Sequence, residues 1–234
     1  MYRTFVLFFL ACFSHQAAAV HEPWVKTEYP QDVEKLWWDD AWWEEGRLDK
    51  PESYAVKMEQ ISYENGDVEV PAYVFRPAKP GKYPPVLFQH GRRGLDELTT
   101  ALPKRLAARG FVVLAPDVFT GRFIERYPME HDYGTDSDVA VGIDVLLTQP
   151  GIKGDKACVV SHTRGGYMTL KALVTHKKQD REVACYVSTY PHWQDPNQPE
   201  PMQIYQYAPE INDLKVPTLV FFGEHEQYQR LRPI

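Results

Sequence analysis

The chain has 234 residues, of which 44% are hydrophobic, and its formal net charge at pH 7 is −6. This length suits one α/β domain with a full core. The acidic balance, with no basic patch, excludes the electrostatic footprint of a nucleic-acid-binding protein and disfavours binding to anionic membranes. No internal repeat or low-complexity tract interrupts the sequence.

Residues 1–19 are predicted to be a secretory signal peptide. Arg3 precedes the apolar run 5–13, and small residues lead up to an expected cleavage site after Ala19. The apolar run is too short to span a bilayer, so we expect no stable membrane anchor. A weak resemblance to a bacterial lipoprotein signal at Cys12 would leave too little apolar sequence before the cysteine. We therefore expect an exported protein, either periplasmic or secreted.

Residues 20–56 form an N-terminal extension rich in tryptophan, with Trp37, Trp38, Trp42 and Trp43 close together. One interpretation is an aromatic surface that binds sugar or lipid. We favour the alternative of a short helix that lays these side chains across the domain, because positions 38 and 42 are one helical turn apart.

From residue 56 onward the predicted strands and helices alternate. A hairpin around Asn65-Gly66 joins the first two strands. The predicted strands are 58–63, 70–75, 85–89, 111–115, 158–160, 183–188 and 218–222, and the helices are 98–109, 137–149 and 167–176. Ser137 or Asp136 is the expected N-cap of the second helix, which Pro150-Gly151 ends. This order predicts a mostly parallel twisted sheet with helices on both faces, and a ligand site beyond the carboxyl ends of the strands.

Two cysteines, Cys158 and Cys185, follow the predicted signal peptide, each in an apolar run typical of a strand. The two strands are expected to be neighbours, and export makes a disulfide possible. We favour the alternative of two buried thiols that pack as small hydrophobic side chains.

The segment Ser161-His162-Thr163-Arg164-Gly165-Gly166 has the pattern of a nucleophile elbow between a strand and a helix. Such a turn is so sharp that its flanking residues must be small and the backbone of its nucleophile is strained. Ser161 and Gly165 meet the size demand. Thr163 takes the nucleophile position and keeps a hydroxyl, but a β-branched residue fits poorly where φ is positive.

Four motifs in this order resemble the α/β-hydrolase superfamily, specifically its dienelactone hydrolase-like family, over residues 57–234. They are VLFQHG at 86–91, VLAPD at 113–117, SHTRGG at 161–166 and LVFFGEHE at 219–226. The resemblance implies an α/β-hydrolase fold that acts on a small ester or lactone by nucleophilic acyl transfer, without a cofactor.

Carried over residue by residue, the resemblance gives each site residue a role. Thr163 stands at the nucleophile position, and the backbone N–H groups of Arg92 and Arg164 would form the oxyanion hole. Glu226 takes the position of the acid, where the family more often has aspartate. A solvated loop carboxylate is the alternative for Glu226, and Asp195 is a second candidate for the acid.

The general base departs from the family pattern. The family order is nucleophile, acid, histidine, and no histidine follows Glu226. We therefore expect the last helix, the edge strand and the catalytic histidine to be missing, which would expose an apolar flank. His192 and His225 are candidate substitute bases. A metal site made of His90, His162, His192 and Glu226 has no recognised ligand spacing, so no metal is predicted.

The leading hypothesis is an exported dienelactone hydrolase-like enzyme whose activity on a small ester or lactone is impaired. Two alternatives stay open. One is a catalytically inactive hydrolase fold that binds a ligand or partner, and the other is a truncated form of a longer, active hydrolase.

Overall fold

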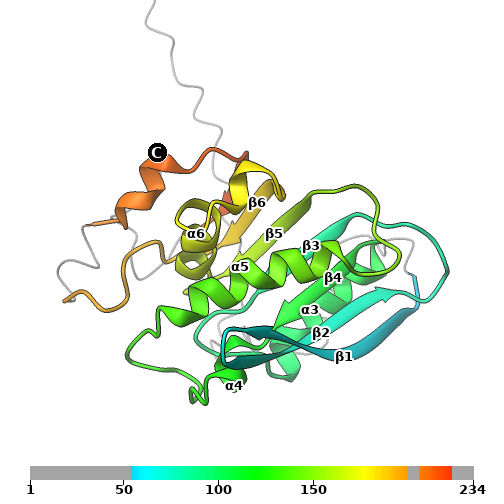
Figure 1. Ribbon diagram of the computed structural model, residues 1–234, viewed down its shortest axis with the longest axis horizontal. Coiled ribbons are helices and arrows are strands. Elements are labelled where there is room, and N and C mark those ends of the chain that lie inside the picture. Colours follow the sequence, from blue (N-terminus) through cyan, green and yellow to red (C-terminus); the bar gives the residue numbers. More distant parts are fainter. Residues whose placement is uncertain (1–53, 200–205, 223–234) are drawn as a thin grey trace, which may run out of the picture. The chain divides into compact units, whose positions relative to one another are not determined.

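The computed structural model describes residues 54–199 and 206–222 (Figure 1). The predicted signal peptide, the tryptophan-rich extension up to residue 53, and the site candidates His225 and Glu226 lie outside the described residues. Within the described part of the chain, no helix has the length and apolar character needed to cross a membrane.

Seven described strands form one mixed sheet in the order β1-β2-β4-β3-β5-β6-β7. Their bounds are Val56–Asn65 (β1), Val68–Pro77 (β2), Pro85–Gln89 (β3), Val112–Pro116 (β4), Ala157–His162 (β5), Val183–Thr189 (β6) and Thr218–Phe221 (β7). β2 pairs antiparallel with both β1 and β4, and the other strands pair in parallel. The expectation of a mostly parallel sheet is confirmed.

The hairpin at Asn65-Gly66 is also confirmed. Asn65 pairs with Val68, so Gly66 and Asp67 form the turn, and Gly66 has a φ of 62°. Glycine adopts this left-handed conformation readily, which is what tight two-residue hairpin turns require.

The helices cover both faces of the sheet (Figure 1). They are Glu97–Ala108 (α3), Val118–Gly121 (α4), Gly134–Leu147 (α5) and Gly165–Val174 (α6), with short 3₁₀ helices at Lys178–Asp180 (η1) and Pro209–Asp213 (η2). One core joins α5 and α6 to Leu87 and Leu114, and a second core on the other face joins α3 to Val86 and Val113. All residues of β3 and β4 are buried, as expected for strands covered on both faces.

The predicted start of the second helix is wrong. α5 begins at Gly134 rather than at residue 137, and neither Ser137 nor Asp136 is its N-cap. Asp132 fixes the earlier start, because its carboxylate accepts the Gly134 N–H at 2.8 Å and its carbonyl accepts the Thr135 N–H at 3.0 Å. These bonds satisfy N–H groups that a helix would otherwise leave without a partner at its first turn.

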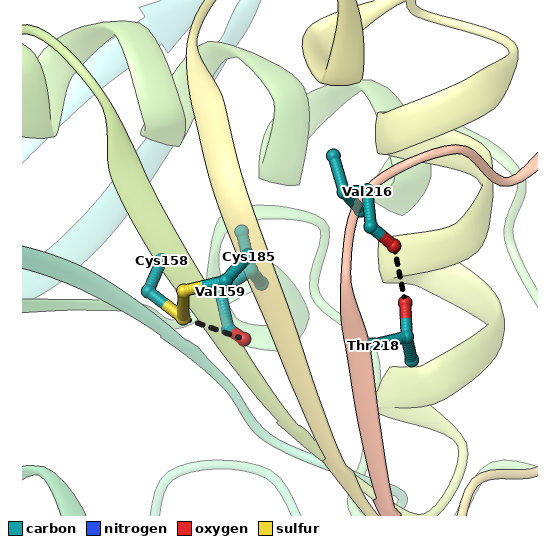
Figure 2. Close-up of a disulfide and its surroundings, with 5 residues drawn as sticks. All are labelled: Cys158, Val159, Cys185, Val216 and Thr218. Atoms are coloured by element: carbon teal, nitrogen blue, oxygen red, sulfur yellow. Dashed lines mark hydrogen bonds between the residues drawn. A yellow bond between two sulfur atoms is a disulfide. The ribbon is translucent and has the colours of Figure 1, made fainter.

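Cys158 on β5 and Cys185 on β6 form a disulfide (Figure 2). The two residues are register partners in parallel strands, with Cα atoms 4.7 Å apart. Paired residues on adjacent strands project to the same face, which brings their sulfur atoms within bonding reach. The expectation of neighbouring strands is confirmed, whereas the preferred interpretation of two separate thiols is wrong.

The Cys158→Ala/Cys185→Ala variant is expected to lose about 3 kcal/mol of unfolding free energy, because the bridge restrains the unfolded chain across a sequence separation of 27 residues. Denaturant unfolding of both proteins, with and without a reductant, measures the difference. Reductant should shift the midpoint of the unmodified protein only. Two titratable thiols at these positions in the denatured, unreduced protein would contradict the assignment.

Candidate active site

Thr163 lies on the tight turn between β5 and α6 and has a φ of 50°. Its backbone N–H donates to the Thr189 carbonyl at 3.0 Å, and its own carbonyl accepts the Gly166 N–H at 2.8 Å. A β-branched residue rarely adopts a positive φ, so these bonds hold a strained conformation of the kind that occurs at functional sites. The prediction of a nucleophile elbow at Thr163 is confirmed in its geometry.

Close packing against the neighbouring strand explains the glycines of the elbow. A Cβ atom on Gly165 would lie 2.5 Å from the His90 carbonyl oxygen and 2.8 Å from that of Gln89, at the end of β3. A Cβ atom on Gly166 would lie 3.1 Å from Pro191. The elbow can therefore come this close to its neighbours only with glycine at position 165.

Ser161 replaces the first glycine of the usual elbow pattern, and the structure gives its hydroxyl a partner. Ser161 is fully buried, and its Oγ lies 2.8 Å from both the Tyr186 hydroxyl and the Ser188 Oγ. The indole N–H of Trp193 donates to the Tyr186 hydroxyl at 3.2 Å. This network, which the sequence analysis missed, ties the elbow strand to β6 and to the loop that follows it. Its signal was the placement of polar residues inside apolar strands.

The Thr163 hydroxyl lies against the turn that carries the expected oxyanion donors. A Cβ atom added to Gly91 would overlap Thr163 Oγ1 and come within 2.8 Å of the His162 carbonyl oxygen. Arg164 is the N-cap of α6, where helix N–H groups point outward and the helix dipole favours negative charge. The structure thus brings together the nucleophile position, the 90–92 turn and the helix N-terminus.

His192 lies beside the elbow, because its backbone N–H donates to the Thr163 carbonyl at 3.1 Å. The pKa of the His192 imidazole is lowered to about 4, mainly by burial and also by Arg164, His162 and Arg92 nearby. The ring is therefore neutral at pH 7 but weakly basic.

His162 and His90, which also belong to the motifs, have structural contacts. His162 Nδ1 lies 2.8 Å from Thr189 Oγ1, and burial lowers the pKa of this imidazole. His90 is fully buried, its Nδ1 lies 2.8 Å from the Gly91 carbonyl oxygen, and burial lowers its pKa as well. Among the described residues, no group of three or more histidine, cysteine or acidic side chains is arranged to hold a metal ion.

Asp195, the second candidate for the catalytic acid, is bonded elsewhere. Its carboxylate accepts the Tyr133 hydroxyl at 2.9 and 3.1 Å and the Asn197 N–H at 3.0 Å. Burial and this carboxylate raise the pKa of the Tyr133 phenol. These bonds to Tyr133 hold the loop of Asp195 in place.

A buried His–Asp pair, which the sequence pattern did not indicate, is linked to this loop. His131 Nε2 lies 3.0 Å from Asp136 Oδ1, and both side chains are almost fully buried. Burial raises the pKa of the Asp136 carboxyl group. Asn197 links the pair to the 190–199 loop, because its amide donates to the His131 carbonyl at 2.9 Å and its Oδ1 accepts the His131 N–H at 2.7 Å.

Comparison with known families agrees with this geometry. The profile of the chlorophyllase family matches residues 43–225, which is most of the chain. This protein belongs to the chlorophyllase family. It is also 37% identical over 82 residues to the hydrolase fragment YghX of Escherichia coli (strain K12), which covers 34% of this chain and 68% of that protein.

Solved structures show the same fold. A protein from Klebsiella pneumoniae subsp. pneumoniae assigned as a dienelactone hydrolase is 20% identical, with a TM-score of 0.53 over 71% of this chain and 72% of that one. The dienelactone hydrolase-like promiscuous phosphotriesterase P91, from metagenomic libraries, is 16% identical, with a TM-score of 0.53 over 72% of this chain and 82% of that one. The expected α/β-hydrolase fold is confirmed, and the family and the relative place this chlorophyllase-family protein among the hydrolases.

Gly91→Ala is expected to lower the free energy of unfolding by about 2 kcal/mol, the usual cost of overpacking. The added methyl group overlaps Thr163 Oγ1. In the Thr163→Ala background the hydroxyl is gone, so the same substitution should cost less. Denaturant unfolding of the four proteins of this cycle measures the coupling, with Gly81→Ala, next to the ring of Tyr83, as a control. Equal costs in both backgrounds would show that the hydroxyl does not face Gly91.

His192 should make the protein less stable in mild acid. The pKa of its imidazole falls from 6.5 to about 4 on folding, so the unfolded state binds the proton more tightly. The stability contributed by the neutral ring is then full above pH 6.5 and is lost as the pH falls toward 4. The difference in unfolding free energy between the unmodified protein and His192→Asn, measured from pH 7.5 to 4, should change over this window. A constant difference would contradict the depressed pKa.

Proposed function

We propose that this protein is an exported dienelactone hydrolase-like enzyme that cleaves a small ester or lactone through nucleophilic acyl transfer, with impaired activity. The observation that carries this proposal is the Thr163 hydroxyl, held on a left-handed turn against Gly91 beside the N-terminus of α6. An acyl-transfer site needs a hydroxyl nucleophile next to backbone N–H donors, and this arrangement supplies both.

The reaction assigns a step to each group. Thr163 Oγ1 forms a bond to the substrate carbonyl carbon while its proton passes to a base. The negative charge that develops on the carbonyl oxygen is stabilised by the backbone N–H groups of Arg92 and Arg164. Collapse of this intermediate expels the alkoxide, which takes a proton, and a lactone would open its ring at this step. Water then hydrolyses the acyl-threonine ester and regenerates the hydroxyl.

The impairment follows from the nucleophile and from the base. The methyl group of Thr163 adds bulk where the backbone is already strained. His192 is the described candidate for the base, and His225 remains a second candidate. A ring with a pKa of about 4 is a weak acceptor for the hydroxyl proton at pH 7. Without an effective base, the oxyanion donors and substrate binding supply the remaining catalysis, as in triad-deficient hydrolases. Glu226 stays the proposed acid.

The second candidate function is a catalytically inactive hydrolase fold that binds a small ligand. The observation that favours it is the weak basicity of His192 beside the elbow, because burial and the nearby charges lower the pKa of its imidazole to about 4. The oxyanion donors would then recognise a carbonyl or carboxylate oxygen without cleaving a bond.

The export proposal is supported by the signal-like residues 1–19 and by the Cys158–Cys185 bond. Structural disulfides persist in oxidising compartments, whereas the cytosol keeps such cysteines reduced. N-terminal sequencing of protein recovered outside the cytoplasm should begin at Val20. Retention of residues 1–19 in cytosolic protein would argue against export.

Turnover of one activated ester, p-nitrophenyl acetate, tests the proposed function. The unmodified protein should show weak turnover that Thr163→Ala abolishes, and Thr163→Ser should raise the rate by less than about tenfold. The gain is small because the base is the larger defect: a well-placed one contributes about 10²–10⁴ in rate. His192→Ala and His225→Ala identify which histidine, if either, accepts the proton. Turnover unchanged in Thr163→Ala would refute the site, and no turnover in any folded variant would favour the ligand-binding function.

A further inference from the structure

The two residues expected to supply the oxyanion N–H groups are also joined through their side chains. Arg92 Nε donates to the Pro128 carbonyl oxygen at 3.1 Å, and Arg164 Nη1 donates to the same oxygen at 2.9 Å. A carbonyl oxygen has two lone pairs, so one peptide group can accept both bonds. Pro128 therefore bridges the turn after β3 and the elbow after β5, which lie far apart in the sequence.

The bridge is anchored by further contacts in the loop between α4 and α5, residues 122–133, here called the α4–α5 loop. The Tyr127 N–H donates to the Arg92 carbonyl at 2.7 Å, and Arg92 Nη2 donates to the Tyr127 carbonyl at 3.0 Å. Tyr127 keeps a φ of 59°, a strained value for a residue with a side chain. Such strain persists only where the surroundings over-determine the backbone, so the loop is held firmly at this point.

Burial makes the bridge strong. Arg164 is only 7% exposed, and hydrogen bonds from a charged guanidinium are stronger than neutral ones, especially where water is excluded. The two guanidinium groups carry like charges and converge on one oxygen, an arrangement that repels. The protein retains this costly arrangement at the two residues whose backbone N–H groups must be aligned for oxyanion binding.

We propose that Arg92 and Arg164 are positioning residues that act through the Pro128 carbonyl to set the spacing of the two oxyanion N–H donors. This inference rests on the proposed function, because it assigns those donors to the reaction. It makes the α4–α5 loop part of the catalytic apparatus without any contact to the reacting atoms. A loop that merely covered the site would need only one of the two bonds.

The test compares Arg92→Met, Arg164→Met and the double variant with Arg76→Met. Arg76 is a matched control, because its Nη1 donates to the Pro150 carbonyl at 3.0 Å near the amino end of β4, away from the elbow. Two backbone amides report on the turns by hydrogen exchange. The Gly94 N–H donates to Gly91 at 3.1 Å in the first turn, and the Gly166 N–H donates to Thr163 at 2.8 Å in the elbow.

We expect each single variant to speed exchange by about tenfold at both amides, including the one on the distant turn, since either substitution breaks the shared bridge. With p-nitrophenyl acetate, kcat should fall about tenfold at an unchanged KM, because alignment of the donors matters in the transition state. The double variant should be no worse than the singles, and Arg76→Met should alter neither readout.

Faster exchange only at the amide of the substituted turn would overturn the proposal. Faster exchange at both amides without a fall in kcat would also overturn it. If no variant of the protein hydrolyses the ester, the proposed function fails, and exchange at Gly94 and Gly166 alone decides whether the bridge exists. If Arg164→Met does not fold, Arg164→Lys replaces it and is compared with Arg92→Met. Lysine should keep one bond to the Pro128 carbonyl, so exchange at Gly94 and Gly166 should be slower than in Arg92→Met.

Discussion

The close approach of the elbow to the end of β3 is the constraint on which the site depends. Gly165 passes so near the carbonyl groups of Gln89 and His90 that a side chain has no room, and Gly91 faces the Thr163 hydroxyl in the same way. This close approach requires the strained, left-handed backbone conformation of Thr163. Once the turn is fixed, Thr163, the 90–92 turn and the N-terminus of α6 lie together at the carboxyl edge of the sheet.

Buried polar contacts, together with the packing of Trp193 in the core, then fix the loops around the site. The Ser161, Tyr186 and Trp193 network holds the loop that carries His192, and the His131–Asp136 pair with Asn197 holds the same loop from the other side. Each group is satisfied inside the protein, where an unpaired polar atom would cost stability. Such networks specify one arrangement, which an acyl-transfer site requires because its groups must stay aligned.

The chemistry at the elbow differs from the family pattern more than the scaffold does. Threonine stands at the nucleophile position on a tight turn, and His192 beside it has its pKa lowered by burial and by the charges of Arg164 and Arg92. The same two arginines that bond to the Pro128 carbonyl also lower the pKa of His192. The hydrolase fold is preserved, but Thr163 and His192 depart from the family pattern. This combination is consistent with a slow hydrolase or with a binding protein built on the hydrolase scaffold.

The sequence predicted what local patterns determine. The hairpin at Asn65-Gly66, the buried strand 85–89 and the elbow at Thr163 each depend on residues close together in the chain, and all three were found where expected. The start of α5 was missed because a residue outside the helix, Asp132, bonds its first N–H groups through its side chain and its carbonyl.

Contacts between residues far apart in the sequence could not be predicted from local sequence patterns. The Cys158–Cys185 bond depends on the register of β5 and β6, and the bridge from Arg92 and Arg164 to Pro128 depends on how a long loop folds back. The sequence contains these residues without indicating that they meet.

A crystal structure of the protein soaked with phenylboronic acid tests the central claim most directly. A boronate mimics the tetrahedral intermediate of acyl transfer when it bonds to the attacking hydroxyl. We predict a bond from boron to Thr163 Oγ1, with one boronate oxygen about 3 Å from the backbone N–H groups of Arg92 and Arg164. A boronate bound to another residue, or a Thr163 hydroxyl turned away from those two N–H groups, would contradict the account.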